Sequence, residues 1–353
     1  MQYKKLVAFP LFALSALSLF VVASADEKIG PYQLIDTILI PGNLAGGFDI
    51  SWVDSASERY YLAERTATAN TGRIDVIDAE HDKFLYSIKG FVGTQPGSGT
   101  SGPDGVLVIH KENELWAGDG DSTVKVVDLN AGASAVPFAI HTGGIKRADE
   151  LAYDPIDHII VIANDRDTPP FMTFISQKTR TVLGQLKYPQ ATSGLEQTVW
   201  DQQTKRFYLN VPATTTNPNG EVDEIDPTTM MVTRVFPIAT PCGPAGLALV
   251  PNQQLMTSCG VVLDARTGAT VATISGVAGD EIWFNPGDGR VYFGTNPMSV
   301  VDAQTNQVIT SIPVGSTHSV AANSENNHIF VPVTGVGVKV YTDSKDQEGS
   351  SGK

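Results

Sequence analysis

The sequence predicts an all-β protein, a seven-bladed β-propeller in which a strand near the N-terminus completes the last blade. Three observations support this prediction. The chain of 353 residues contains 33 Gly and 21 Pro, which indicates many short segments joined by tight turns. A pattern of short strands recurs about every 45 residues, the size of a propeller blade. No sustained helical periodicity occurs between Tyr32 and Thr342.

Residues 1–25 are predicted to be a signal peptide. Lys4 and Lys5 form a positive region, residues 6–22 are largely apolar, and residues 23–25 (Ala-Ser-Ala) match a cleavage site. The alternative is an uncleaved anchor, which needs about 20 apolar residues, whereas this stretch is interrupted by a proline and two serines. We therefore expect a periplasmic or secreted protein without a membrane anchor after cleavage, with the propeller at 26–342 and a flexible tail at 343–353.

Each repeat has a recognisable order of strands. The first strand is followed by an acidic or polar residue, as in Ala152–Pro155, and the second strand is short and apolar, as in Ile159–Ile162. The third strands end in an apolar residue followed by Asp, at Asp78, Asp128, Asp226, Asp264 and Asp302. A fourth strand begins after a Thr-containing turn, as at Thr305–Ile309. The last repeat has only three strands, so we expect Leu34–Ile40 to supply its fourth.

Two of these repeats carry a family resemblance. Residues 300–308 (VVDAQTNQV) and 262–268 (VLDARTG) resemble the repeat of the YVTN-type, or YncE-like, bacterial propellers. Residues 241–249 (PCGPAGLAL), running on to Cys259, resemble a recurring blade of the same group. The resemblance covers roughly residues 33–342 and implies the propeller fold and export. It implies no particular activity, because propellers host many unrelated functions.

The two cysteines of the chain, Cys242 and Cys259, are 17 positions apart. An even cysteine count in an exported protein favours a disulfide. A zinc site is disfavoured because no histidine is near either cysteine. We expect both residues on one face of the fifth blade, where neighbouring antiparallel strands bring Cα atoms within bridging distance.

An acidic ring is predicted where the chain enters the innermost strands. The equivalent first-strand positions, of which five of seven are acidic, are Asp49, Asp104, Asp149, Glu196, Ala245, Asp280 and His318. In a propeller, the loops entering the first strands and the loops joining the second and third strands open on one face. These side chains should therefore surround one mouth of the central channel. The alternative interpretation is that they only cap turns.

Converging carboxylates repel each other and are tolerated when solvated, protonated or bound to a cation. The candidate metal ligands are Glu150, Glu196, Glu281 and Asn164, whose oxygen atoms suit Ca²⁺, Mg²⁺ or Mn²⁺; a nearby histidine would also admit Zn²⁺ or Fe²⁺. His318 and Asp149 are the candidate catalytic acid or base, and Arg147, Arg166 and Asp280 are the candidate substrate-binding residues.

The sequence thus favours a small-molecule site at the acidic mouth, with a divalent-metal-assisted hydrolase (for instance a lactonase) or lyase as its function. The alternative is a non-enzymatic ligand-binding or protein-docking propeller. A nucleic-acid partner is disfavoured by the formal charge of −14, which becomes −16 after loss of two lysines with the signal peptide. We expect a monomer.

Overall fold

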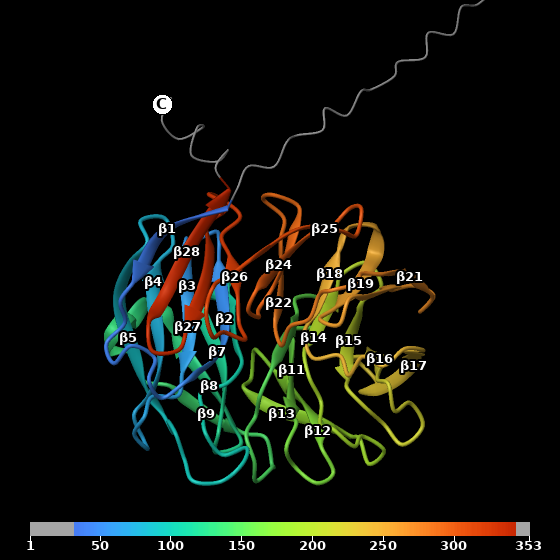
Figure 1. The fold of residues 1–353 in the computed structure, drawn as a ribbon. Helices are drawn as coiled ribbons and strands as arrows, with labels where there is room; N and C mark the ends of the chain where they lie inside the picture. The colour runs from blue at the N-terminus through green and yellow to red at the C-terminus, as the bar shows by residue number, and fades with distance from the viewer. Residues whose placement is uncertain (1–31, 344–353) are drawn as a thin grey trace, which may run out of the picture.

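The short apolar segments form strands because β-branched and aromatic residues suit a pleated, half-buried surface, and because aspartates end them in tight turns. The Asp302 carboxylate, for example, accepts hydrogen bonds from the backbone N–H groups of Gln304 and Thr305 at 3.0 and 2.7 Å. Asp78, Asp226 and Asp264 cap equivalent turns. The computed structural model describes residues 32–343, which form seven four-stranded antiparallel sheets arranged as a propeller (Figure 1). The predicted fold is confirmed.

The seven sheets follow the chain. Blade 1 is β2 (Phe48–Asp54), β3 (Arg59–Glu64), β4 (Gly72–Asp78) and β5 (Lys83–Phe91). Blade 2 is β6 (Val106–Ile109), β7 (Glu114–Asp119), β8 (Thr123–Asp128) and β9 (Phe138–His141). Blade 3 is β10 (Leu151–Asp154), β11 (Ile159–Asn164), β12 (Phe171–Ser176) and β13 (Thr181–Lys187). Blade 4 is β14 (Thr198–Asp201), β15 (Arg206–Val211), β16 (Glu221–Asp226) and β17 (Met231–Pro237).

The remaining blades are shorter in places. Blade 5 is β18 (Leu247–Val250), β19 (Gln254–Thr257), β20 (Val261–Asp264) and β21 (Thr270–Thr273). Blade 6 is β22 (Ile282–Asn285), β23 (Arg290–Phe293), β24 (Met298–Asp302) and β25 (Gln307–Ile312). Blade 7 is β26 (Ala321–Ala322), β27 (Ile329–Val333), β28 (Gly337–Asp343) and β1 (Tyr32–Ile38). Three 3₁₀ turns lie at His110–Glu112, Leu129–Ser134 and Pro251–Gln253.

The N-terminal strand closes the ring. β1 pairs antiparallel with β28, from Tyr32 opposite Asp343 to Ile38 opposite Val338, and is the outermost strand of blade 7. The predicted supply of the fourth strand is therefore confirmed. The predicted signal peptide and most of the predicted tail lie outside the described residues. No helix in the described part of the chain is long and apolar enough to span a lipid bilayer.

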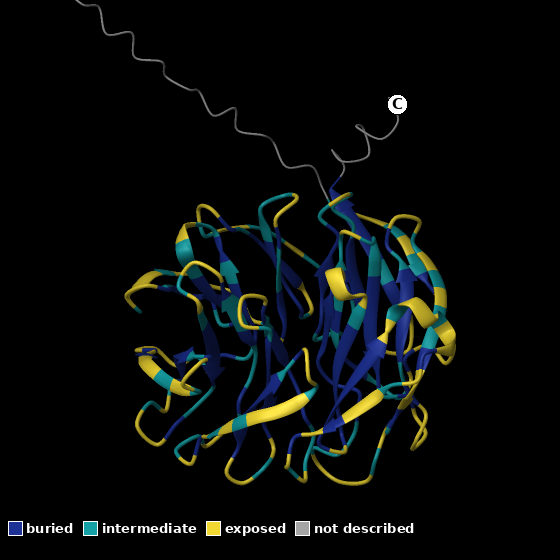
Figure 2. Cartoon of the chain, turned by 180° about the vertical axis from the view of Figure 1, so that it is seen from behind, coloured by how far each residue is buried: buried dark blue, intermediate teal, exposed yellow. Residues whose placement is uncertain are grey.

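The core lies between the blades. Each apolar cluster joins neighbouring sheets, and outer strands such as β13 and β17 are mostly exposed. In Figure 2, buried inner strands are dark blue, and exposed and intermediate segments around them are yellow and teal. Trp116 is fully buried between blades 2 and 3. Trp200 packs edge-on against Phe207 with ring centroids 4.8 Å apart, against the core between blades 3 and 4.

The predicted disulfide is present between Cys242 and Cys259, whose Cα atoms are 5.5 Å apart. Cys242 lies in the loop before β18, and Cys259 lies in the turn between β19 and β20. The bridge therefore joins two loops on the face of blade 5 where the chain enters the innermost strand.

Candidate functional site at the acidic mouth

The innermost strands all run in the same direction along the channel, so sequence position translates into depth. The backbone N–H groups of Ile50 and Gly105 donate to the carbonyls of Asp104 and Asp149 in the next blade, at 3.3 and 3.1 Å. Glu281 donates in the same way to His318 at 3.1 Å. These bonds align the predicted ring of first-strand residues at one level and place the residues that follow them one step deeper. A Cβ at position 105 would lie 2.2 Å from the carbonyl oxygen of Asp149, so this close approach requires glycine.

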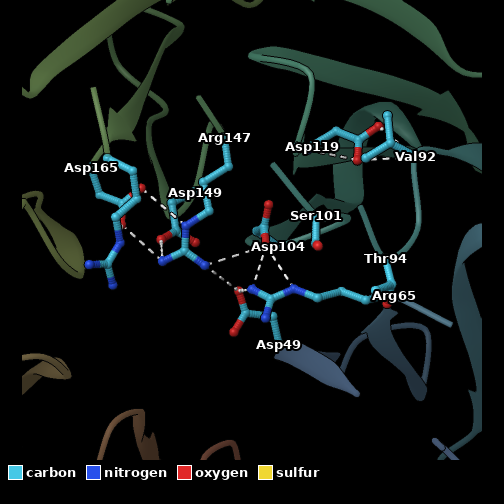
Figure 3. A network of polar contacts seen from close by, with 12 residues as sticks. Asp49, Arg65, Val92, Thr94, Ser101, Asp104, Asp119, Arg147, Asp149 and Asp165 are labelled. Carbon is cyan, nitrogen blue, oxygen red and sulfur yellow. Dashed lines mark hydrogen bonds and ion pairs between the residues drawn. The ribbon is translucent and has the colours of Figure 1, made fainter. Parts of the chain in front are cut away.

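Two arginines bridge three aspartates at the mouth (Figure 3). Arg65 donates to Asp49 at 2.5 Å and to Asp104 through both Nε (3.0 Å) and Nη2 (2.5 Å). Arg147 contacts Asp149 at 2.5 Å and lies 3.5 Å from both Asp49 and Asp104. The acidic triad of Asp49, Asp104 and Asp149 is buried, and its oxygen atoms lie within 4.8 Å of one another.

A fourth carboxylate holds Arg147 from the other side. Asp165, which directly follows β11, accepts hydrogen bonds from Nε and Nη2 of Arg147 at 3.1 and 2.9 Å and pairs with Arg166 at 2.8 Å. Such a two-pronged contact fixes the plane of the guanidinium group. Arg147 is therefore fully engaged by carboxylates, whereas the side chain of Arg166 is about half exposed (49%).

The charges of the triad are unequal. Burial disfavours ionisation of Asp49, but Arg65, His318 and Arg147 outweigh it and hold the pKa of Asp49 well below its ordinary value. Burial raises the pKa values of Asp104 and Asp149 well above the ordinary value, because nearby carboxylates add repulsion that the two arginines do not cancel. Asp49 is thus the ionised partner of the arginines.

His318, which precedes β26 of blade 7, lies next to Asp49 of blade 1. Its ring stacks on Phe48 with centroids 4.7 Å apart, and its Nε2 lies 3.3 Å from Oδ1 of Asp49. Burial alone would lower its pKa, yet the hydrogen bond and the charge of Asp49, with that of Asp280, raise it. About a third of the side chain is exposed (36%), so this imidazole can exchange a proton with solvent.

Below the triad, two glutamates meet without a cationic partner. Glu150 and Glu281 are only 5% and 4% exposed, and their carboxyl groups share a hydrogen bond. Burial raises both pKa values well above the ordinary value, and the charges of neighbouring carboxylates, chiefly Glu281 for Glu150 and Asp280 for Glu281, add to the effect. Within residues 32–343, neither these glutamates nor Glu196 forms an ion pair. Burial, Asp280 and Asp165 raise the pKa of Glu196 to about 8.

The glutamate pair lines a small cavity between the innermost strands. This cavity, which we call the neck, has a volume of about 30 Å³ and is bordered by Glu150, Glu281, Gln197, Ile50 and Trp52 among others. A volume of this size holds one or two water molecules or a small ion. The neck is therefore the place where two buried carboxyl groups, restricted solvent and the lack of a cationic partner coincide.

The remaining predicted residues are Asn164 and Asp280. Asn164 is fully buried, its amide donates to Thr142 and Ser122 at 2.9 and 3.2 Å, and its Oδ1 accepts from Thr173. Both the oxygen and the nitrogen of the Asn164 side chain thus already form hydrogen bonds inside the protein. Asp280 lies near Asp49 and His318, where burial raises its pKa.

Sequence analysis missed Arg65 and Asp165 as members of the site. Both lie one residue beyond the end of a second strand, in the loops that open on the same face as the aligned first-strand positions. An alignment of these loops as well would have found them. Arg65, a positive charge next to a largely acidic ring, is the signal that this alignment would have shown.

The arrangement separates into two layers with different chemistry. In the upper layer, guanidinium groups already neutralise much of the acidic triad, although Oδ2 of Asp104 is buried without a hydrogen-bond partner. The triad has the oxygen donors that a metal ion needs. In the lower layer, the glutamates have no counter-charge, so a cation there would displace only protons and water.

No protein-family model matches the chain, and no curated protein matches it. Solved structures do resemble it. A chain of the crystal structure of a mitotic checkpoint complex has 13% identity and a TM-score of 0.65 over 96% of this chain and 98% of that one. The WD40 β-propeller domain of Doa1 has 14% identity and a TM-score of 0.66 over 90% of this chain and 99% of that domain. At these identities the similarity establishes the seven-bladed propeller fold alone.

Proposed function

We propose that this protein binds a divalent cation in the neck through Glu150 and Glu281, with Glu196 above them, and that the bound ion serves a small-molecule reaction at the acidic mouth. The observation that carries the proposal is the pair of buried glutamates that share a hydrogen bond and have no cationic partner among the described residues. Like charges at such a distance are stable only when protonated or when a cation lies between them.

Oxygen-only ligands favour Ca²⁺, Mg²⁺ or Mn²⁺, which prefer carboxylates and water. A bound ion of this class would polarise a carbonyl group or acidify a water molecule, the chemistry of a hydrolase such as a lactonase, or of a lyase. His318 supports the proposal because it is partly exposed and paired with Asp49, which suits a group that moves protons at the mouth. Arg166 supports it as the half-exposed cation that faces an incoming carboxylate.

The test compares melting temperatures of the wild type, Glu150→Gln, Glu281→Gln and a matched control, Asp223→Asn. Asp223 is equally buried (1% exposed), and burial raises its pKa to about 8, but it lies in blade 4 away from the neck. Each protein is measured with chelator and with Ca²⁺, Mg²⁺ or Mn²⁺ in turn. A ligand present at 100 times its Kd stabilises the folded state by about 2.7 kcal/mol.

We expect one of the ions to stabilise the wild type and Asp223→Asn to the same extent, and to lose its effect on both glutamate variants. In chelator, the glutamate variants should be as stable as the wild type or more stable, because they relieve repulsion between buried carboxyls. The cation site is ruled out if no ion stabilises the wild type, or if the glutamate variants retain the full response.

A non-enzymatic docking propeller is the second candidate. One of the similar folds is a chain of a multi-protein checkpoint complex, and several apolar side chains on the described surface are exposed, including Val136 and Ile145. The resemblance of residues 262–268 and 300–308 to YVTN-type repeats supports an exported propeller under either function. Retention of the metal response without turnover of any ester or lactone substrate would favour the docking function over the enzyme.

A further inference from the structure

A second and larger cavity adjoins the neck. A cavity of about 470 Å³ lies along the later residues of the innermost strands and is bordered by Trp52, Leu107, Tyr153, Val199, Trp200 and Leu249 among others. We call it the apolar vestibule. It shares Trp52, Leu151 and Gln197 with the neck, so the two cavities are neighbours along the channel. The vestibule therefore lies on the side of the neck opposite the acidic mouth.

The walls of the vestibule have the composition of a small-molecule site. None of its twelve lining residues is charged, and its volume is within the range of 300–1,000 Å³ that is usual for ligand pockets. Trp52, Tyr153 and Trp200 are only partly buried. Trp52 packs edge-on against Trp283, with centroids 5.3 Å apart, and Trp200 packs on Phe207. Rigid aromatic surface is thus left for a ligand to cover.

One polar group lies at the floor of the vestibule, where it meets the neck. The backbone N–H of Leu247 donates to Oε1 of Gln197 at 2.5 Å, which fixes the orientation of the amide. The Nε2 group of Gln197 has no partner among the described residues, so two N–H donors remain for a ligand. A donor beside uncharged aromatic walls selects a hydrogen-bond acceptor and not an ion.

We propose that the apolar vestibule binds a neutral aromatic small molecule that carries a carbonyl group, with the carbonyl oxygen accepting a hydrogen bond from Gln197 Nε2. Anions and cations are disfavoured there because no lining residue offers a counter-charge and burial of an unpaired charge is costly. This inference does not depend on the metal site, because none of the proposed metal ligands lines the vestibule.

The probe is 6-propionyl-2-(dimethylamino)naphthalene, a neutral naphthyl ketone whose emission moves to shorter wavelength in an apolar site. We expect saturable binding to the wild type. Leu249→Arg places a charge in the vestibule and should weaken binding at least about ten-fold. The matched control is Leu183→Arg, the same change at a partly exposed leucine on the outer strand β13, which should bind as the wild type does.

The role of Gln197 has its own test, which needs no destabilised variant. Displacement of the probe from the wild type by 2-acetylnaphthalene is compared with displacement by 2-ethylnaphthalene, which lacks the acceptor. One hydrogen bond should make the ketone bind about three- to ten-fold more tightly. Gln197→Met has a side chain of similar length without a donor and should abolish this preference.

Three results would overturn the proposal: no saturable binding of the probe, equal binding by Leu249→Arg and the wild type, or no preference for the ketone in the wild type. Circular dichroism spectra of each variant establish that it is folded before its binding is measured. Failure here would leave the response of the neck to cations unaffected, so the two proposals are separately testable.

Discussion

At the level of single residues, the acidic mouth is stable because Arg147 is shared among several carboxylates. It contacts Asp149 and Asp165 at 2.5 and 2.9 Å and is 3.5 Å from Asp49 and Asp104. All four aspartates are buried. Burying charge in this way costs desolvation free energy, which good geometry and several partners offset. Removal of the shared cation would leave buried carboxylates uncompensated.

We therefore expect Arg147→Gln to lower the free energy of unfolding by about 3–5 kcal/mol, the usual cost of removing one partner of a buried ion pair. Arg206→Gln is the control, because Arg206 forms a more exposed pair with Asp226 at 2.9 Å and should cost about 1 kcal/mol or less. Urea unfolding of both variants gives the comparison. Equal losses in the two variants would show that the mouth network contributes no more than a surface pair.

Glu196 makes the stability of the folded protein depend on pH. Its pKa is about 8 in the folded protein and 4.5 in ordinary surroundings, so folding favours the protonated form. Its contribution to stability is therefore complete below about pH 4.5 and is lost as the pH rises towards 8. Glu196→Gln cannot ionise and avoids this loss. The stability of the wild type relative to Glu196→Gln should fall across this pH range.

Urea unfolding in chelator at several pH values between 4.5 and 8.5 measures that difference. A pH-independent difference between the two proteins would mean that Glu196 titrates normally. Addition of the stabilising divalent ion should reduce the fall, because a cation favours the ionised carboxylate.

At the level of the strands, the periodic pattern of the sequence was sufficient to predict the blades. Short runs such as Ile159–Val161 are bounded by turn residues, and the Asp at the end of each third strand, such as Asp302, caps a turn through its carboxylate. Both signals are local, so they can be read without knowledge of distant contacts. The alignment of first-strand positions then placed Asp49 and Asp149 at one mouth, as the structure has them.

The chemistry within the ring could not be predicted in the same way. Which carboxylate is paired depends on the direction of long side chains from loops, and Arg65 reaches Asp104 from a loop 39 positions away. Asn164 has a suitable residue type for a metal ligand, but its partners in β12 and in the preceding blade already satisfy it. Sequence position sets the level of a residue along the channel, whereas packing decides what its side chain contacts.

Blade 5 combines short strands with the disulfide. Its strands β18 to β21 have four residues each, and the disulfide between Cys242 and Cys259 closes a loop at one end of two of them. A bridge across 17 positions restricts the unfolded chain and should contribute roughly 3 kcal/mol. Replacing both cysteines by serine should lower the free energy of unfolding by about that amount.

Reduction of the wild type with dithiothreitol should produce the same loss, whereas the double serine variant should not respond to the reductant. Two free thiols in the denatured, unreduced wild type would show that the bridge does not form. A double serine variant as stable as the wild type would show that blade 5 is held by its packing alone.

At the level of the whole molecule, the two proposed sites depend on a closed ring. The neck is bordered by residues of blades 1, 2, 3, 4, 6 and 7, and the vestibule by residues of blades 1 to 5. Opening the ring at any joint would change the spacing of the glutamates. The joint most open to experiment is blade 7, where β1 and β28 come from opposite ends of the chain.

Because β1 pairs with β28, we expect a circular permutant of the chain to fold. Because Tyr32 lies opposite Asp343, a turn of a few Gly and Ser residues can connect them as a hairpin. New ends can be made between Gly42 and Asn43, both of which are exposed. The permutant keeps every strand pairing and should melt within a few degrees of the wild type, with the same response to divalent ions.

The matched truncation, residues 43–343 alone, leaves the edge of β28 unpaired, so we expect it to melt at a lower temperature and to aggregate. Thermal melts with light scattering distinguish these outcomes, and a truncation as stable and soluble as the permutant would show that β1 does not close the propeller.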